Sequence, residues 1–155
     1  MIGFFGHGGG GSGDLLFEEY LWNDNGFRDL IEKRIFVNNY GEGLKLLLIK
    51  FYVDGSIMKF TPWERRISNF SNKNKDISYD IFVNEENFFK QDDRARRNFI
   101  VDSTLEAVRA VKTKLQKKIK VDFDRLLQDV ENLRKEYVGE KININLTALL
   151  APIII

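Results

Sequence analysis

The chain has 155 residues, a formal net charge of +1, 30% charged residues, 43% hydrophobic residues and no cysteine. These values are typical of one soluble globular domain, and they exclude disulfides, thiolate catalysis and cysteine-ligated zinc. No stretch reaches the roughly 20 apolar residues of a membrane-spanning helix, and the N-terminus lacks the basic region of a signal peptide. We therefore expect a cytoplasmic protein with no membrane partner.

The N-terminal segment, residues 1–13, contains seven glycines and is expected to be a flexible tail or linker. Its Gly6-x-Gly8-x-x-Gly11 spacing matches dinucleotide-binding loops, and its His7-Gly8-Gly9-Gly10 run matches esterase oxyanion loops. The first motif needs a surrounding βαβ unit, and the second needs a nucleophile elbow and another histidine. His7 is the only histidine, so neither motif predicts chemistry.

The next elements predict strands joined by turns. Residues 15–22 fit either a strand or a short helix, and residues 27–37 favour a strand at their C-terminal end, where β-branched residues gather. Residues 44–53 form the clearest strand pattern. The Asp-Gly turn at 53–56 predicts a hairpin to residues 57–60.

The later elements predict a second hairpin and then two helices. Residues 65–71 and 76–83 are separated by the polar turn 72–75. Apolar residues then recur at helical spacing from about Asp93 to Ile119 and again over 121–139. The pattern predicts an α+β fold with an antiparallel β meander of about four to five strands, followed by two long helices packed on one face.

Three segments follow from this organisation. Residues 1–13 are the Gly-rich tail, residues 14–139 are a single α+β domain, and residues 140–155 are an apolar tail of uncertain status. The last segment fits an edge strand, and it also fits a piece that is foreign to the domain.

Acidic residues supply the remaining candidates for catalysis or metal binding. Glu85, Glu86, Asp92 and Asp93 bracket the start of the first long helix, where negative charge complements the helix dipole. Without a histidine beside them they predict no general acid–base pair. We predict no catalytic residue, no metal site and no cofactor, and hence a protein that is not an enzyme.

Basic residues concentrate in one segment. Residues 94–120 contain nine Arg and Lys against Asp102 and Glu106, a net charge of +7. Such a helix is compatible with binding a nucleic-acid backbone, especially through Arg109, Lys112, Lys117, Lys118 and Lys120. A solvated helix surface explains the same charges.

Aromatic residues near turns indicate a protein-binding module. Trp22 precedes a turn, Tyr40 lies inside "NNYGEG", and Trp63 follows Pro62. Tryptophan and tyrosine are favoured anchors of protein interfaces.

The order of elements resembles a known class of proteins. The segments "IEKRIFVNNYGEGLKLLLIKFYV" (31–53), "KFTPWERR" (59–66) and the stretch from "DISYDIFV" to "DVENL" (76–133) resemble immunity proteins of bacterial polymorphic and contact-dependent growth inhibition toxin systems. The likeness covers about residues 14–138, although the Lys59–Pro62 spacing is one residue shorter than in that pattern. The resemblance implies an α+β protein that binds one cognate toxin domain tightly, blocks its active site or activation, and has no catalysis of its own.

The predicted toxin-binding residues lie on loops and strands. If the toxin is a nuclease, its active site is basic, and Glu42, Asp76 and Asp80 would mimic phosphate while Tyr40 and Trp63 anchor the contact. The alternative is a nucleic-acid-binding domain that uses the basic helix 94–120. The sequence leaves the oligomeric state open.

Overall fold

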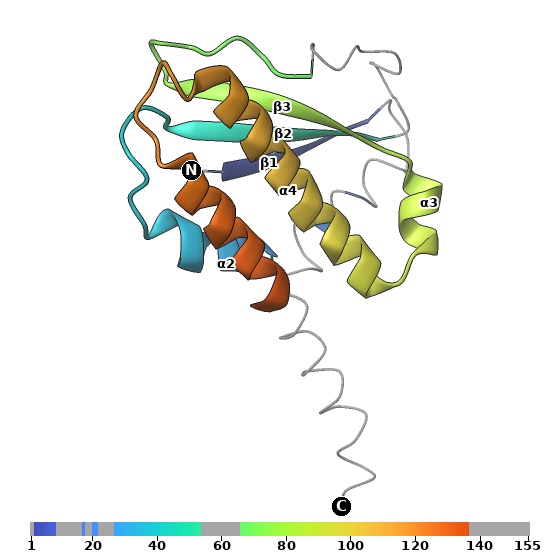
Figure 1. Ribbon diagram of the computed structural model, residues 1–155. Helices are drawn as coiled ribbons and strands as arrows, with labels where there is room; N and C mark the ends of the chain where they lie inside the picture. Colours follow the sequence, from blue (N-terminus) through green and yellow to red (C-terminus); the bar gives the residue numbers. More distant parts are fainter. Residues whose placement is uncertain (1, 9–16, 18–19, 22–26, 54–65, 137–155) are drawn as a thin grey trace, which may run out of the picture.

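The computed structural model describes residues 2–8, 17, 20–21, 27–53 and 66–136 (Figure 1). Three strands, β1 (Ile2–Gly8), β2 (Leu46–Val53) and β3 (Asp76–Val83), form one parallel sheet in the order β1-β2-β3. The helical elements are α2 (Phe27–Ile31), the π-helical turn η2 (Glu32–Phe36), α3 (Glu85–Lys90), α4 (Asp93–Leu115) and a further helix over residues 123–136. The chain is therefore an α+β protein.

The two strands β2 and β3 each bury every second side chain. Their register pairs Leu47 with Ile77 and continues to Val53 with Val83, so their buried residues share one face of the sheet. This is the period of two that a strand imposes, because successive side chains point to opposite faces. The buried face consists of Leu47, Ile49, Phe51 and Val53 of β2 and Ile77, Tyr79, Ile81 and Val83 of β3.

The helix α4 crosses in front of the sheet in the view of Figure 1, and helix 123–136 lies beside α4. The carboxylate of Asp92 caps α4 by accepting a hydrogen bond from the Ala95 backbone N–H at 2.8 Å. Asp122 accepts in the same way from the Arg125 N–H at 3.1 Å at the start of helix 123–136. The predicted apolar stripe of the first helix is buried at Ile100, Thr104, Ala107, Val108, Val111 and Leu115. Its last predicted member, Ile119, lies beyond the end of α4 at Leu115 and is only partly buried.

Phenylalanine residues join the sheet to the surrounding helices. Phe17 packs against Phe51 of β2 and Phe88 of α3, with ring centroids 5.2 and 5.1 Å apart. Phe4 of β1 packs against Phe27 of α2 at 5.8 Å. Tilted and edge-on ring pairs of this kind stabilise a core beyond the area they bury, which accounts for part of the chain's 13 phenylalanines.

The predicted antiparallel meander is wrong, because the sheet has three parallel strands. β2 has a parallel neighbour along each edge, β1 on one side and β3 on the other. Both edges of β2 are therefore filled. The hairpin predicted from residues 53–56 to 57–60 falls on residues 54–65, which lie outside the described part of the chain. Parallel neighbours need a crossover of a dozen or more residues, and the stretch 54–75 is long enough for one.

Two further segments differ from their predictions. Residues 27–37 were predicted to end as a strand, but they form α2 and η2, with Phe27, Leu30, Ile31 and Ile35 buried at helical spacing. Residues 2–8, predicted as part of a flexible tail, form β1, and Ile2 and Phe4 are buried. The glycines of this segment interrupt the alternation of apolar and polar side chains by which a strand is usually recognised in a sequence.

The second predicted hairpin is present in reduced form. Residues 66–71 run antiparallel to β3 through the bridges Ile67↔Tyr79 and Ser71↔Asp76. The domain limits at 13/14 and 139/140 stay predictions, since residues 9–16 and 137–155 lie outside the described residues.

Candidate functional site

One face of the sheet is free of helices among the described residues, namely the face opposite α4 (Figure 1). Parallel sheets in proteins are nearly always covered on both faces, so a half-exposed parallel face is a candidate for covering by a partner. We name it the helix-free face. It consists of the half-exposed alternate residues Leu46, Leu48, Lys50 and Tyr52 of β2 and Asp76, Ser78, Asp80 and Phe82 of β3.

The helix-free face combines aromatic and charged groups. The rings of Tyr52 and Phe82 are 6.1 Å apart, and the Arg66 guanidinium lies 4.7 Å from the centre of the Phe82 ring. Lys50 and Asp80 are direct neighbours across the two strands. Burial, together with the negative charge of Asp80, raises the pKa of Tyr52 above its ordinary value. The aromatic rings suit the centre of a protein–protein contact, and the charged groups suit its polar rim.

Tyr40, a predicted anchor, is held within the molecule. Its hydroxyl donates a hydrogen bond to the Asp129 carboxylate at 2.6 Å, and its backbone carbonyl accepts one from the Asp122 N–H at 2.7 Å. The Arg125 guanidinium lies 5.3 Å from its ring centre. Burial and the Asp129 hydrogen bond raise the pKa of Tyr40 to about 12. These contacts fasten the 38–45 loop to helix 123–136.

The other predicted toxin-binding residues lie in different places. Asp76 and Asp80 share the helix-free face, at the start and middle of β3. Glu42 is exposed on the loop before β2, and Trp63 lies outside the described residues. The structure thus brings two of the predicted carboxylates onto one face, without bringing Tyr40 to them.

A second surface, the lysine groove, lies where three loops meet before the starts of β2 and β3. It has a volume of about 310 Å³. Sequence reasoning missed the groove because its residues come from three distant segments. Two of its lysines, Lys118 and Lys120, belong to the basic segment 94–120. The groove is lined by Glu42, Gly43, Phe70, Asn72, Lys75, Lys118, Ile119 and Lys120.

The basic helix predicted for nucleic acid does not present one continuous stripe. Arg97 is buried and pairs with Asp93, and Lys112 pairs with Asp124 at 2.6 Å. Lys114 donates to the Ser68 carbonyl at 2.9 Å. Lys117, Lys118 and Lys120 lie beyond the end of α4 at Leu115. A helix whose cations are divided in this way is a poor match for a phosphate backbone.

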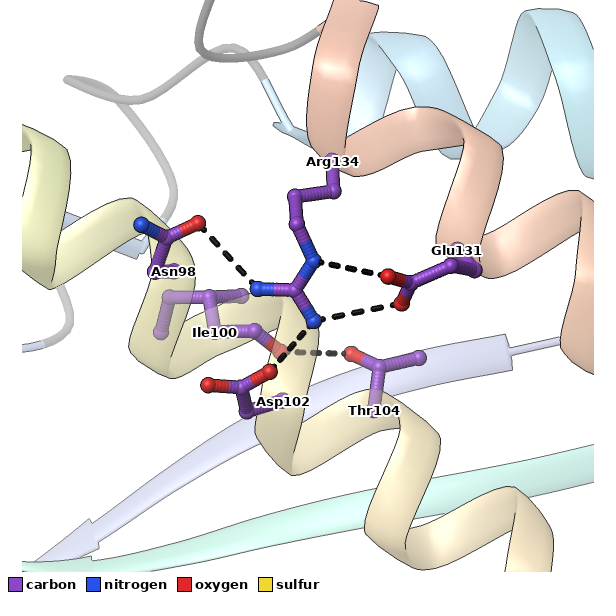
Figure 2. Close-up of polar contacts among 6 residues, drawn as sticks. All are labelled: Asn98, Ile100, Asp102, Thr104, Glu131 and Arg134. Carbon is purple, nitrogen blue, oxygen red and sulfur yellow. Dashed lines mark hydrogen bonds and ion pairs between the residues drawn. The ribbon is translucent and has the colours of Figure 1, made fainter.

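Arg134 ties helix 123–136 to α4 (Figure 2). Its guanidinium donates to Asn98 Oδ1 at 3.2 Å, to the Asp102 carboxylate, and to the Glu131 carboxylate at 3.1 and 3.2 Å. These carboxylates and the Glu131 hydrogen bond raise the pKa of Arg134, against the opposing effect of burial. The charges of Arg134, Asp102 and Glu131 are therefore engaged in contacts within and between these two helices.

Metal-binding clusters and membrane-spanning helices are both absent from the described residues. Within those ranges, no three His, Cys, Asp or Glu side chains gather in a way that would hold a metal ion. No helix in the same part of the chain is long and apolar enough to cross a membrane.

The fold and surface define a small α+β protein with a helix-free sheet face beside a basic groove. The model of the family described as immunity protein 44 matches residues 11–136, so the chain belongs to the immunity protein 44 family. The match confirms the resemblance to immunity proteins of toxin systems that the order of elements predicted. No curated protein and no solved structure is significantly similar to the chain.

Proposed function

We propose that this immunity protein neutralises one cognate toxin domain by binding it with the helix-free face and occluding its active site. The observation that carries the proposal is the pairing of partly exposed apolar side chains with charge on a face of the parallel sheet that no helix of the described residues covers. Tyr52 and Phe82 supply aromatic area at its centre. Large rigid aromatics at the middle of a contact contribute most of its binding energy.

The charges of the face support a partner with a basic region. Asp76 and Asp80 carry negative charge on β3. Lys50 lies beside Asp80 and Arg66 lies beside Phe82, and these positive charges would help to fix the orientation of a partner. A nuclease is the toxin class we propose, because its active site must attract phosphate. Glu42 belongs to the other surface, Tyr40 supports the loop, and the role of Trp63 stays a prediction.

The first experiment identifies the partner by its effect. The tagged chain captures proteins at low and high salt from a native lysate in which the neighbouring genes are expressed. We expect one stoichiometric protein that survives high salt, that stops growth when expressed alone, and whose toxicity disappears on co-expression with this chain. Nucleic acid recovered only at low salt, with no toxic partner, would contradict the proposal and favour the basic helix.

The second experiment locates the contact. Asp80→Lys reverses a charge on the helix-free face, and Tyr52→Ala removes ring area from it; each should weaken toxin binding about tenfold or more. The matched control, Asp29→Lys, reverses an exposed carboxylate on α2. Urea unfolding of each variant separates loss of binding from loss of fold. If both face variants bind with unchanged Kd, the helix-free face is not the contact.

A further inference from the structure

The lysine groove is shaped by two glycines that let the 38–45 loop approach the backbone of residues 119–121. Gly41 has a φ of 120°, and a Cβ there would lie 2.1 Å from the Lys120 carbonyl oxygen. A Cβ on Gly43 would lie 2.6 Å from the Ile119 Cβ. Side chains do not tolerate such distances, so the wall of the groove depends on glycine at both positions.

Lys75 occupies a backbone conformation that favours glycine or asparagine. Its φ is 54°, in the left-handed region, and its carbonyl accepts hydrogen bonds from the N–H groups of Lys45 and Leu46 at 2.7 and 3.3 Å. The Lys75 ammonium group lies 3.5 Å from the Glu42 carbonyl oxygen, at the groove. A strained residue held by its surroundings is a reason to look for a function of its side chain.

The groove combines positive charge with apolar side chains. Lys75, Lys118 and Lys120 supply three ammonium groups, and the half-buried side chains of Phe70 and Ile119, which we name its floor, supply apolar area. Among the described residues, no carboxylate lies within 4.0 Å of these three ammonium groups, whereas Lys90 and Lys112 each have such a partner. The groove therefore carries positive charge that its own neighbours leave unbalanced.

We propose that the lysine groove receives an acidic segment of the bound toxin domain, with a carboxylate between the lysines and an apolar side chain on the floor. This inference rests on the proposed function. The Glu42 carboxylate also lines the groove, so its three lysines face one carboxylate and leave a net positive charge for an acidic segment. A partner that offers basic groups to Asp76 and Asp80 and acidic groups to the lysines can dock in one orientation, which provides specificity.

The first test uses the full chain without a toxin. The ¹⁵N-labelled protein is titrated with the peptide Ac-Glu-Leu-Glu-NH₂, with its uncharged counterpart Ac-Gln-Leu-Gln-NH₂, and with inorganic phosphate. We expect amide shifts at Gly43, Phe70 and Ile119 with the acidic peptide at the lowest concentration of the three. Equal shifts with the glutamine peptide, or tighter binding of phosphate, would overturn the assignment of an acidic peptide.

The second test measures toxin binding by the variant Lys118→Gln/Lys120→Gln. Each exposed charge contributes modestly, so the pair should weaken binding about tenfold, and the loss should shrink at high salt. The control, Lys33→Gln/Lys135→Gln, removes two exposed lysines from η2 and helix 123–136. If the groove variant binds a toxin that the chain neutralises with unchanged affinity, the groove does not receive a segment of the toxin, and the proposed function still holds. Failure to neutralise any toxin, with peptide shifts intact, overturns the proposed function instead.

Discussion

At the residue scale, two tyrosines hold their hydroxyl protons more tightly than an exposed tyrosine does. Burial raises the pKa of Tyr79 to about 12, and the negative charge of Glu106 adds to the effect. Tyr40 reaches about 12 through burial and Asp129. The unfolded chain loses these protons near pH 10, while the folded chain keeps them. The free energy of unfolding should therefore be unaffected by these groups below pH 10 and fall between pH 10 and 12.

The variant Tyr40→Phe tests this account. At pH 8 it should lower the free energy of unfolding by about 1 kcal/mol, because Asp129 loses its hydroxyl donor. Between pH 10 and 11.5 it should lose less stability than the wild type, since one of the groups with a raised pKa is gone. Urea unfolding at several pH values measures both effects. Equal alkaline losses in the two proteins would contradict the raised pKa of Tyr40.

At the element scale, Arg134 is the main polar connection that we describe between α4 and helix 123–136 (Figure 2). The Arg134 side chain is only 29% exposed, and its guanidinium reaches groups on both helices. Several hydrogen bonds from one planar group fix a geometry as well as adding stability. Lys112 and Asp124 join the same two helices, but Asp124 is 81% exposed.

A double-mutant cycle compares these two connections. Arg134→Met with Asp102→Asn should show a coupling free energy of about 1 kcal/mol, measured by urea unfolding. The control cycle, Lys112→Met with Asp124→Asn, should give less than about 0.5 kcal/mol because solvent screens an exposed pair. A larger coupling free energy for Lys112 and Asp124 than for Arg134 and Asp102 would contradict the expectation that the more exposed pair is the weaker one.

The elements differ in how far the sequence predicts them. The helices around 93–115 and 123–136 and the strands β2 and β3 follow from periodicity, because each buries one side of a regular pattern. The strand pairing does not follow, since parallel and antiparallel neighbours show the same alternation and only the connections differ. The lysine groove escapes prediction for a related reason: Gly41 and Lys120 meet only after the fold has formed.

At the scale of the whole molecule, β1 lies before the family match, which begins at residue 11, yet it belongs to the sheet. It pairs with β2 from Ile2 to Gly8 and packs Phe4 beside Phe51, with ring centroids 6.2 Å apart. Without β1, the edge of β2 would present unpaired N–H and C=O groups. A chain limited to the family match would therefore lack part of the fold.

A chain that begins at residue 9 tests the contribution of β1. We expect its free energy of unfolding to fall by about 3 kcal/mol or more, and we expect association through the open edge of β2 at high concentration. Phe4→Ala is the control, since it should lose about 3 kcal/mol while leaving the strand edge paired. Urea unfolding and size-exclusion chromatography measure the two effects. An unchanged urea midpoint in the shortened chain would contradict the role of β1.

The parallel sheet also has a consequence for synthesis. Ile2 pairs with Leu47, and Leu46 pairs with Asp76, so β1 and β2 each pair with a strand that is synthesised much later. Loop closure precedes every such pairing, which slows folding compared with a meander of hairpins. β1 leaves the ribosome before β2, and its apolar residues Ile2 and Phe4 stay uncovered until β2 has emerged. In the cell, the interval between the synthesis of β1 and that of β2 therefore exposes apolar surface that can aggregate.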